Sequence, residues 1–396
     1  MLRSRIHTKL ISNMNKIFII MKEDVVQYPP ILSMFHALID LNFQVVHIGV
    51  YSDLVQKSFL ESKGIEFFND VKLNVSANPI AKIFQQLEFK KYVSKVLKER
   101  YEEGDYLVVV NEDTMCLLWN AICQYKLVLY FLETPGYNVR LKYRIYNPLF
   151  NLTKACQQAY KVVCCEYNRA HIIKGIYQLD TLPVILPNKY YQSNSLSQSH
   201  SIPHDIIQRV EELKTILDGK KVILYQGVFT SKERRLEEFI HAVSDMPKEY
   251  LLLAMGRGDK MFEELKKQYS SSKIVFIDFI RPPYHLLVTQ MAHVGVLSYF
   301  PNNKSFIDVL NPIYCAPNKI FEYTRYSLPM ISNDLPALKN VFQEFQCGEV
   351  VDYPLTSSRI KNGLNKIFQS YEIYKHGAGR YYNSVDCMEI IAGIFR

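Results

Sequence analysis

Several signatures of secreted, zinc-binding or membrane-spanning proteins are missing from this sequence. Its eight cysteines contain no C-x-x-C pair and no regular spacing, which indicates free thiols in a reducing compartment and argues against a structural zinc. Residues 1–14 are basic but hold no apolar run long enough for a signal peptide or a membrane span. This basic N-terminal extension is either a tail that touches a membrane or an over-long assigned start.

Three common catalytic signatures are also absent. No G-x-S-x-G elbow and no Walker loop occurs, so serine-hydrolase and P-loop chemistry find no support. No Asp-x-Asp pair occurs either, and metal-dependent transferases of the single-domain type usually hold a diphosphate through such a pair. We therefore expect no metal and no cofactor, and expect Arg234, Lys319 and helix ends to neutralise any bound diphosphate.

The composition is that of a globular protein with two domains. The 396 residues exceed one ordinary core, and 48% of them are hydrophobic while only 22% are charged. The net charge of +8 favours an anionic partner, either a nucleotide phosphate, a lipid headgroup or a nucleic acid. The basic residues form no recognisable nucleic-acid module, so we do not expect that last partner.

Short apolar runs alternate with helical patterns along the whole chain, which predicts parallel sheets. The polar, serine-rich run 192–201 interrupts this alternation and is the clearest linker. We therefore predict an α/β protein with two doubly wound, Rossmann-like domains that face each other across a cleft. The predicted strands are 16–21, 44–50, 65–68, 106–110, 127–131, 160–165, 184–187, 221–226, 250–255, 274–277, 294–298 and 328–332.

The stretch 311–340 reads as a loop, a short helix, a tight turn, a strand and the start of a second helix. Pro317 suits the first helical position, which places Asn318 and Lys319 in the first turn, where free N–H groups can hold an anion. Glu322 lies one turn later on the face of Lys319 and can accept hydroxyl hydrogen bonds. The alternative is a Lys–Glu pair on a solvated helix face.

Gly227 follows the strand KVILYQ, and Arg234 and Arg235 precede the next helix. A glycine there lets the backbone approach a ligand, and arginines at a helix start can bind a phosphate through two hydrogen bonds. The alternative is a surface turn with two solvated arginines.

Gly256 and Gly258 end the strand YLLLAM and form a second candidate donor site. They match only part of the dinucleotide pattern G-x-G-x-x-G, because Met261 stands at the position of its third glycine. By itself this partial match indicates little.

Two carboxylates follow strands of the first half and are candidates for meeting an acceptor hydroxyl. Glu133 comes after LVLYF, and Glu166 comes after Cys164 and Cys165. The alternative for each is a helix cap or a solvated group.

Two basic segments are candidates for contact with a membrane. The helical pattern 82–101 has six basic and two acidic residues, and 137–154 mixes Arg140, Lys142 and Arg144 with aromatic residues. The alternative for the helix is a core face with a solvated basic side.

Taken together, these segments make the sequence resemble a GT-B glycosyltransferase of family 4, the kind that builds bacterial surface polysaccharides. The resemblance is strongest over about 220–352 and extends more loosely into the first half. It rests on KVILYQG, RRLEEFIHAV, LLLAMGRG, the run 294–300, PNKIFEYTRYSLPMISND, GEVV at 348–351, CCEYNRA and VILPN.

The resemblance implies an enzyme that moves a sugar from a nucleotide diphosphate sugar to a glycan or lipid-linked acceptor, in the cytoplasm or at the inner face of the plasma membrane. Glu322 matches the second glutamate of the family's E-x7-E motif, which accepts the ribose hydroxyls. Asn318 and Lys319 match the helix start that faces the diphosphate and sugar, and Arg234 and Gly227 match a phosphate-binding position and a glycine-rich turn. Catalytic roles are thus implied for Arg234, Lys319 and Glu322.

This sequence departs from the family motif at one position. Tyr314 stands where the first glutamate belongs, so the resemblance does not specify how the donor sugar is held or the stereochemical outcome. The alternatives are a nucleotide-sugar epimerase of the same fold and a non-catalytic nucleotide-sugar-binding protein. The implied organisation is an N-terminal acceptor domain at 15–191, a linker at 192–205, a nucleotide-sugar domain at 206–370, and a C-terminal helix at 371–396 that packs back on the N-terminal domain.

Overall fold

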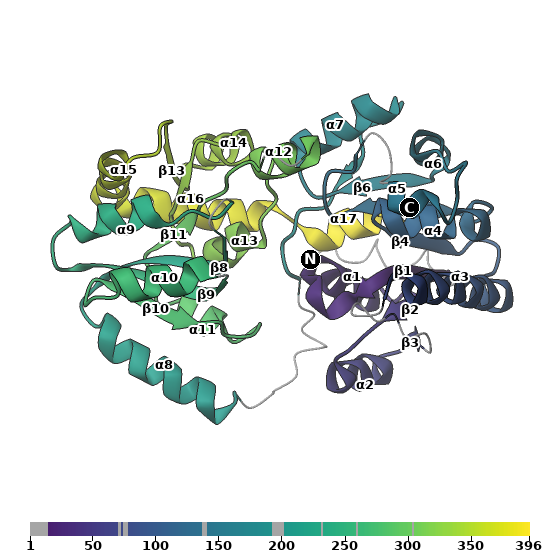
Figure 1. Ribbon diagram of the computed structural model, residues 1–396, viewed down its shortest axis with the longest axis horizontal. Coiled ribbons are helices and arrows are strands. Elements are labelled where there is room, and N and C mark those ends of the chain that lie inside the picture. Colours follow the sequence, from purple (N-terminus) through teal and green to yellow (C-terminus); the bar gives the residue numbers. More distant parts are fainter. Residues whose placement is uncertain are drawn as a thin grey trace, which may run out of the picture. The chain divides into compact units, whose positions relative to one another are not determined.

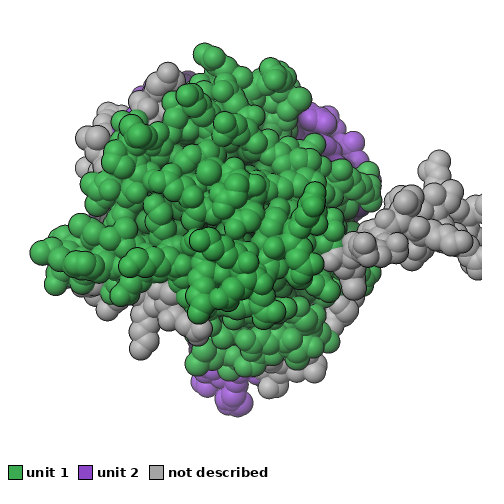
Figure 2. Space-filling view, turned by 90° about the vertical axis from the view of Figure 1, so that its right-hand side faces the viewer, with its two compact units in different colours: residues 1–197, 387–396 green, residues 198–386 purple. Residues whose placement is uncertain are grey.

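A computed structural model describes residues 15–69, 73, 78–136, 141–191, 202–230, 233–258, 260–302 and 305–396, with only the backbone described for Leu141, Lys142 and Met261. The chain divides into two compact units, coloured separately in Figure 2. We call residues 1–197 and 387–396 the N-terminal unit, and residues 198–386 the C-terminal unit.

The N-terminal unit is built on a seven-stranded parallel sheet with the order β3-β2-β1-β4-β5-β6-β7 (Figure 1). Its central strands are almost wholly apolar because helices cover both faces. Phe18 and Ile20 pack against one layer of helices, and Ile17 and Ile19 against the other. The strands are β1 Lys16–Asp24, β2 Gln44–Val50, β3 Ile65–Phe68, β4 Tyr106–Val110, β5 Leu127–Phe131, β6 Lys161–Cys164 and β7 Val184–Ile185.

The helices of this unit follow the strands as expected for right-handed crossovers. One face of the sheet is covered by α3 Pro79–Arg100, α4 Glu112–Ile122, α6 Leu152–Gln158 and α7 Tyr167–Tyr177. The other face is covered by α1 Pro29–Asp40, α2 Leu54–Ser62 and α17 Cys387–Ile394. The short elements η1 Val25–Gln27 and α5 Leu141–Arg144 complete the unit.

The C-terminal unit repeats this plan with a six-stranded parallel sheet of order β10-β9-β8-β11-β12-β13. Its strands are β8 Lys221–Phe229, β9 Tyr250–Gly258, β10 Ile274–Asp278, β11 Val294–Leu297, β12 Met330–Asn333 and β13 Gly348–Val351. One face packs against α8 His204–Leu217, α11 Leu286–Thr289, α13 Asn318–Thr324, α14 Pro336–Phe345 and α16 Tyr371–Ser384. The other packs against α9 Glu237–Ser244, α10 Lys260–Tyr269 and α15 Ser357–Gln369.

Both sheets reverse their strand order next to their first strand, as in Rossmann-type sheets. The reversal lies between β1 and β4 in the N-terminal unit and between β8 and β11 in the C-terminal unit. Ligands of open α/β sheets bind at the carboxyl ends of the strands at such a switch point. The prediction of two doubly wound α/β units is confirmed, and each unit has one place where a ligand site is expected.

The structure differs from the predicted elements in several places. The strand β13 was not predicted, and β8 and β9 run past their predicted ends to Phe229 and Gly258, so Gly227 lies within a strand. Residues taken as a loop before Pro317 form α12 Phe306–Ile313, whose first turn is capped by Ser305 and whose last turn contains Pro312. The C-terminal segment, expected to be one helix, forms α16 in the C-terminal unit and α17 in the N-terminal unit, with a break at residues 385–386. A proline near a helix end and a short extended break are both weak signals in a sequence.

Candidate active site

The carboxyl end of β8 and the helix α13 bring Glu322 into a fixed network at the C-terminal switch point. Gln226 Nε2 donates to Glu322 Oε2 at 2.5 Å, and His285 Nε2 lies 3.3 Å from Oε1. Thr289 Oγ1 donates to Gln226 Oε1 at 2.8 Å and so fixes the orientation of that amide. The carboxylate is therefore held from two sides before any ligand binds.

This network keeps Glu322 ionised. Burial opposes the negative charge, but the hydrogen bond and charge of His285, the amide of Gln226 and the nearby Lys319 outweigh burial and lower the pKa of Glu322. About a quarter of the side chain is exposed. A carboxylate has about four lone-pair positions, and the described residues Gln226 and His285 use two of them, which leaves two that can accept hydroxyl hydrogen bonds.

Lys319 lies beside this carboxylate in an unusual environment. Its ammonium is buried, and no described residue accepts a hydrogen bond from it. Nζ lies 4.5 Å from the ring centroid of Tyr225 and 5.5 Å from that of Tyr299, so aromatic faces replace water around it. Burial, together with the positive charge of Arg234, lowers the pKa of Lys319 to about 7, while Glu322 opposes the shift.

The absence of a side chain at Gly227 makes room for this ammonium. A Cβ atom at residue 227 would lie 2.7 Å from Lys319 Cε and 2.8 Å from Nζ, and the φ of +128° is itself a conformation that favours glycine. Gly227 therefore belongs to the site because it leaves room for Lys319. A sequence pattern alone does not reveal this contact.

The two candidate arginines have different surroundings. Arg234 stacks on Tyr299, with its guanidinium carbon 4.2 Å from the ring centroid, and its charge contributes to the shift of Lys319. Arg235 is exposed, stacks on Phe300 at 4.7 Å, and uses its backbone carbonyl to accept from Ser298. The structure brings Arg234 to Lys319 and gives Arg235 no contact with this group.

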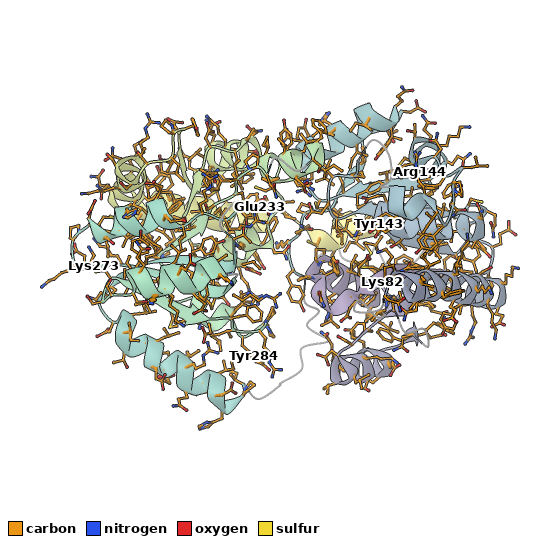
Figure 3. All side chains as sticks on the ribbon, viewed as in Figure 1. Lys82, Tyr143, Arg144, Glu233, Lys273 and Tyr284 are labelled. Carbon is orange, nitrogen blue, oxygen red and sulfur yellow. The ribbon has the colours of Figure 1, made fainter. Side chains whose placement is uncertain are left out.

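Glu233, the residue before Arg234, is held by two hydrogen bonds. Asn302 Nδ2 donates to Glu233 Oε1 at 2.6 Å, and the Phe300 N–H donates to the Glu233 carbonyl at 3.1 Å. The labelled side chain of Glu233 can be found in Figure 3. The carboxylate and the carbonyl of Glu233 therefore fix the chain next to Arg234.

The second glycine pair has a packing role. Gly256 lies opposite Gly227 in the parallel register of β8 and β9, and a Cβ atom on it would clash with the Gly227 carbonyl. A Cβ on Gly258 would lie 2.5 Å from the Cβ of Phe262 and 2.9 Å from that of Phe229. Both glycines therefore permit close contact of β9 with its neighbours. This packing explains why glycine stands at both positions, and no bound ligand is needed to explain it.

The helix α13 begins one residue later than predicted. Pro317 is its N-cap, with φ of −74° and ψ of 137°, so Asn318 is the first helical residue and the half-buried Lys319 the second. An extended ψ is what places Pro317 outside the helix. The predicted helix and the shared face of Lys319 and Glu322 are otherwise present.

One residue that sequence reasoning missed determines the position of α13. The ring of Tyr323 occupies the space where a side chain on Gly295 of β11 would lie, and its hydroxyl donates to the Leu224 carbonyl of β8 at 3.2 Å. Tyr323 follows Glu322 directly. Its contact with the sheet thus fixes the direction in which Glu322 and Lys319 leave the helix.

The two acceptor-side candidates have structural partners in the N-terminal unit. Glu133 is largely exposed and forms an ion pair at 3.0 Å with the buried Arg169, whose Nη1 also donates to the Leu132 carbonyl. Glu166 is the N-cap of α7, and its carboxylate accepts from the Arg169 N–H at 2.9 Å. Glu166 is therefore a helix cap, as the alternative interpretation had it, and Glu133 neutralises the charge of the buried Arg169.

A different group occupies the switch point of the N-terminal sheet. Lys22 and Glu23 lie at the end of β1, and Lys22 Nζ contacts both Glu23 Oε1 and, at 2.5 Å, Asp113 Oδ2 at the start of α4. Glu23 Oε2 is buried, and none of the described side chains or backbone groups hydrogen-bonds to it. We call Lys22, Glu23 and Asp113 the switch-point triad.

The triad has perturbed acid–base properties. Burial and the negative charge of Asp113 raise the pKa of Glu23, although Lys22 opposes the shift. Burial opposes the charge of Lys22, but its two carboxylates outweigh burial and raise its pKa. Burial and the charge of Asp113 also raise the pKa of Tyr143, labelled in Figure 3, to about 12. The signal in the sequence was the charged pair directly after an apolar strand.

The membrane candidates can be assessed only in part. Arg140 lies outside the described residues, the side chain of Lys142 is not described, and Arg144 is partly buried at the end of α5. No helix in the described ranges combines the length and hydropathy needed to cross a bilayer. A different feature stands out on α3: four exposed apolar side chains recur at helical spacing, namely Ile80, Ile83, Phe84 and Leu87.

Comparisons with known proteins identify the fold. No family model matches the sequence, and no curated protein matches it. The chain is similar to the solved structure of WaaG, a glycosyltransferase involved in lipopolysaccharide biosynthesis, with 13% identity, coverage of 96% of this chain and 98% of that one, and a TM-score of 0.57. It is also similar to HepE of Anabaena in complex with UDP-glucose, with 13% identity, 96% and 98% coverage, and a TM-score of 0.64.

A third similar structure is a glycosyltransferase from Rickettsia africae, with 13% identity, coverage of 97% and 94%, and a TM-score of 0.63. All three matches span nearly the whole of both chains, so they include both units. Identity at this level establishes architecture alone. The chain has the two-domain GT-B fold of these glycosyltransferases.

Proposed function

We propose that this protein is a glycosyltransferase that uses a nucleotide diphosphate sugar as donor. The observation that carries the proposal is the pairing of a buried ammonium on Lys319 with an ionised carboxylate on Glu322, one turn apart at the C-terminal switch point. The first suits a phosphate and the second suits hydroxyl groups. A nucleotide sugar presents both within one molecule.

Charge stabilisation of the leaving diphosphate is the main catalytic contribution of this unit. As the bond between the anomeric carbon and the diphosphate oxygen breaks, negative charge grows on that oxygen, where Lys319 and Arg234 stabilise it. An anion next to Lys319 favours its protonated form, so the ligand restores the charge that burial removes. We propose this arrangement as a metal-independent one, with Glu322 holding the ribose hydroxyls.

On the acceptor side we propose the switch-point triad in place of Glu133 and Glu166. Glu23 has a buried carboxylate oxygen without a hydrogen-bond partner among the described residues, whereas the other two carboxylates already serve Arg169 and the start of α7. A sugar hydroxyl that donates to Glu23 Oε2 would satisfy this oxygen and orient the hydroxyl oxygen for attack.

The acceptor class that we propose is a glycan or a lipid-linked glycan of a bacterial surface polysaccharide. The motif resemblance supports it, as does the similarity to WaaG, whose described role is in lipopolysaccharide biosynthesis. The similarity to HepE bound to UDP-glucose supports a nucleotide-sugar donor and makes UDP-glucose the first donor to test.

Peripheral contact with an anionic membrane, on the cytoplasmic side, completes the proposal. Ile80, Ile83, Phe84 and Leu87 form an exposed row on the first half of α3, which we call the α3 apolar stripe, while apolar residues of the second half are buried in the core. Lysines, Lys82 among them, flank the stripe on the same helix. Apolar side chains with adjacent cations suit an interface with anionic lipid.

The test of the donor proposal uses the purified full-length chain and radiolabelled UDP-glucose. A glycosyltransferase transfers label to an added glycan or slowly releases glucose to water. An epimerase converts the donor to an isomer with no acceptor present, and a non-catalytic protein binds UDP without turnover. Conversion to an isomer, or binding without any turnover across a panel of nucleotide sugars, would refute the proposed activity.

A further inference from the structure

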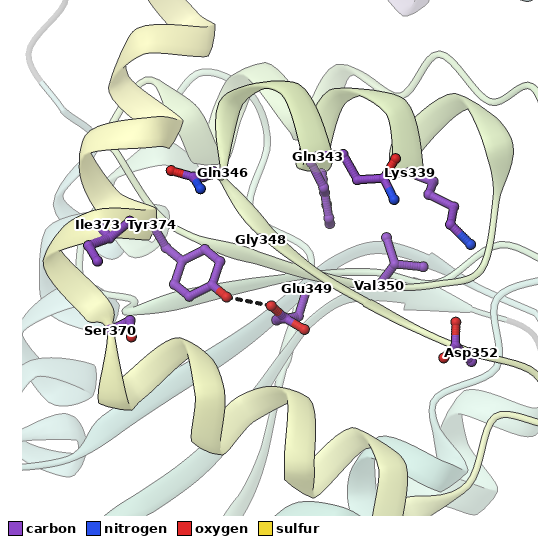
Figure 4. Close-up of a pocket in the computed structure, with 11 residues that line it drawn as sticks. Lys339, Gln343, Gln346, Gly348, Glu349, Val350, Asp352, Ser370, Ile373 and Tyr374 are labelled. Atoms are coloured by element: carbon purple, nitrogen blue, oxygen red, sulfur yellow. Dashed lines mark hydrogen bonds between the residues drawn. The ribbon is translucent and has the colours of Figure 1, made fainter.

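A cavity of the C-terminal unit lies outside the residues assigned to the donor. It has a volume of about 520 Å³ and is formed by α14, β13 and the start of α16 (Figure 4). None of its lining residues belongs to the group around Lys319 and Glu322. Its size lies within the range of pockets that hold small ligands.

The cavity follows the open edge of the second sheet. Of the strands that the structure describes, only β12 pairs with β13. The Met330 N–H donates to the Cys347 carbonyl, and the register pairs Met330 with Gly348. In a parallel ladder with this register, the backbone groups of Glu349 face β12 while those of Gly348 and Val350 face away from it. Gly348 and Val350 both line the cavity, so their backbone N–H and C=O groups are present at its wall.

The side chains around the cavity supply hydrogen-bond donors and acceptors in similar measure. Gln343 on α14 and Gln346 just after it carry exposed amides, each of which both donates and accepts. Lys339 and Asp352 add one charge of each sign. The hydroxyl of Ser370 and the apolar side chain of Ile373 contribute from the other wall.

Glu349 is the second carboxylate of the cavity, and it is already engaged. It accepts a short hydrogen bond from Tyr374, drawn as a dashed line in Figure 4, and lies 3.5 Å from Lys366 Nζ. Burial and this hydrogen bond raise the pKa of Tyr374, so the phenol remains a hydroxyl donor. Lys339 is also paired, with Asp334 at 3.3 Å, so the amides of Gln343 and Gln346 and the hydroxyl of Ser370 are the uncharged side-chain groups of the lining that a ligand can meet.

This chemistry discriminates between ligand classes. The carboxylates of Glu349 and Asp352 are matched in number by the ammonium groups of Lys366 and Lys339, so the site has no excess positive charge to attract a phosphate, and its polar walls oppose a purely apolar molecule. Amides, hydroxyls and backbone groups match a molecule whose groups donate and accept together, as sugar hydroxyls do. The apolar side chains of Phe342, Val350 and Ile373 suit the C–H face of a sugar ring.

We propose that this cavity binds an uncharged saccharide, such as a segment of the glycan acceptor or product. The proposal rests on the proposed transferase function and deepens it, because a saccharide held here would keep the glycan on the enzyme between turnovers. An extended peptide that pairs with the β13 edge is the competing occupant. The short edge of four residues offers such a strand few hydrogen bonds.

Calorimetric titration of the full-length protein tests the proposal with maltotriose, cellotriose and chitotriose as probes, and with glucose 6-phosphate as the anionic comparison. We expect at least one neutral probe to bind the wild type and glucose 6-phosphate to bind more weakly. Because each lost hydrogen bond changes affinity by about twofold to tenfold, the double variant Gln343→Ala/Asp352→Asn should weaken binding about tenfold or more. The matched control is Glu344→Gln, which alters the next, exposed residue of α14 outside the cavity.

The outcomes separate this inference from the proposed function. UDP is titrated into the same samples, and saccharide binding without UDP binding would contradict the donor proposal while supporting the cavity. UDP binding with no bound saccharide, or with equal saccharide affinity in the double variant, would overturn the cavity proposal. A dimer in sedimentation that the double variant abolishes would also overturn it, because a second copy would then occupy the edge.

Discussion

The ammonium of Lys319 occupies the space that a side chain on Gly227 would fill: a Cβ on residue 227 would lie 2.8 Å from Nζ. These two residues are 92 positions apart in the sequence, at the end of β8 and in the first turn of α13. Their contact explains why a glycine stands at the switch point. It also makes Gly227 a means of moving Lys319 without altering it.

The first prediction concerns Gly227→Ala. The new methyl group would displace Lys319, and the backbone strain at φ +128° would cost about 1–3 kcal/mol of stability. We expect UDP affinity, measured by calorimetry, to fall about tenfold or more, because the variant moves a charged contact to the diphosphate.

The matched control for this change is Gly219→Ala. Gly219 also has a positive φ, of +65°, but a Cβ atom on it would meet no atom of the described residues within 4 Å, apart from its chain neighbours. It should lose stability through strain and keep its UDP affinity. Equal loss of affinity in both variants would show that Gly227 acts on the fold and has no specific relation to Lys319.

The second prediction concerns the carboxylate that is proposed to hold the ribose. Glu322→Ala removes one or two hydrogen bonds to a charged acceptor, each worth about 1.5–3 kcal/mol, so UDP affinity should fall by at least about tenfold. Gln226→Ala should cause a smaller loss, since it removes the amide that orients Glu322. Unchanged UDP binding in Glu322→Ala would remove this residue from the donor site, and the exposed Glu264→Ala serves as control.

The third prediction is a proton uptake on binding. In the free protein Lys319 has a pKa lowered to about 7, and a bound diphosphate should raise it. At a pH between the pKa of Lys319 in the free protein and its higher pKa in the complex, Lys319 is protonated in the complex and largely deprotonated in the free protein. UDP affinity should therefore decrease as the pH rises above about 7. Calorimetry at pH 8 in buffers of different ionisation enthalpy should show uptake in the wild type and its loss in Lys319→Met. Uptake of the same size in that variant would assign the proton to another group.

The fourth prediction concerns acceptor chemistry in the N-terminal unit. Glu23→Gln should leave UDP binding unchanged and reduce transfer to an added glycan by at least about tenfold, because it removes the proposed charged acceptor for a hydroxyl. Glu102→Gln is the matched control, since its ion pair with Lys16 lies at the opposite end of β1. Transfer at the wild-type rate in Glu23→Gln, with its melting temperature preserved, would refute the acceptor role of the triad.

The fifth prediction tests the membrane surface. Replacing Ile80 and Phe84, which are 68% and 63% exposed, with Gln should reduce cosedimentation with vesicles that contain anionic lipid. The same replacement of Leu54 and Val55, which are 68% and 70% exposed on α2, is the control for general loss of apolar surface. A further variant, Arg140→Gln/Lys142→Gln/Arg144→Gln, tests the basic segment. An unchanged fraction of vesicle-bound protein in the α3 variant would show that the α3 apolar stripe does not contact the membrane.

The architecture was predictable because its signals are local. The buried strands β4 and β5 are continuous apolar runs of five residues, and their bounds match the predicted ones. The helix α12 was missed because Pro312 looks like a helix breaker, although it lies in the last turn. Patterns within a few residues of each other thus determined most elements, and the elements that they missed, α12 and β13, are short.

The candidate site was predictable only in part, since its contacts join distant segments. Lys319 and Glu322 share a short helix and were found together, but Gln226 lies 96 residues from the carboxylate that it contacts. His285 and Thr289 come from a segment that has no motif. The switch-point triad required knowledge of strand order, because Asp113 joins Lys22 only when β4 lies beside β1.

The packing of the Tyr323 ring against Gly295 has a consequence for ligand affinity. Because its ring fills a gap in the sheet and its hydroxyl is bonded to β8, α13 cannot rotate without unpacking the core. The side chains that meet the nucleotide therefore start from an ordered backbone, and a ligand need not immobilise that backbone when it binds. A larger residue at position 295 would displace Tyr323 and loosen α13, although it would not touch the ligand. The ligand would then have to order the backbone of α13 when it binds, and the lost conformational entropy would weaken its affinity.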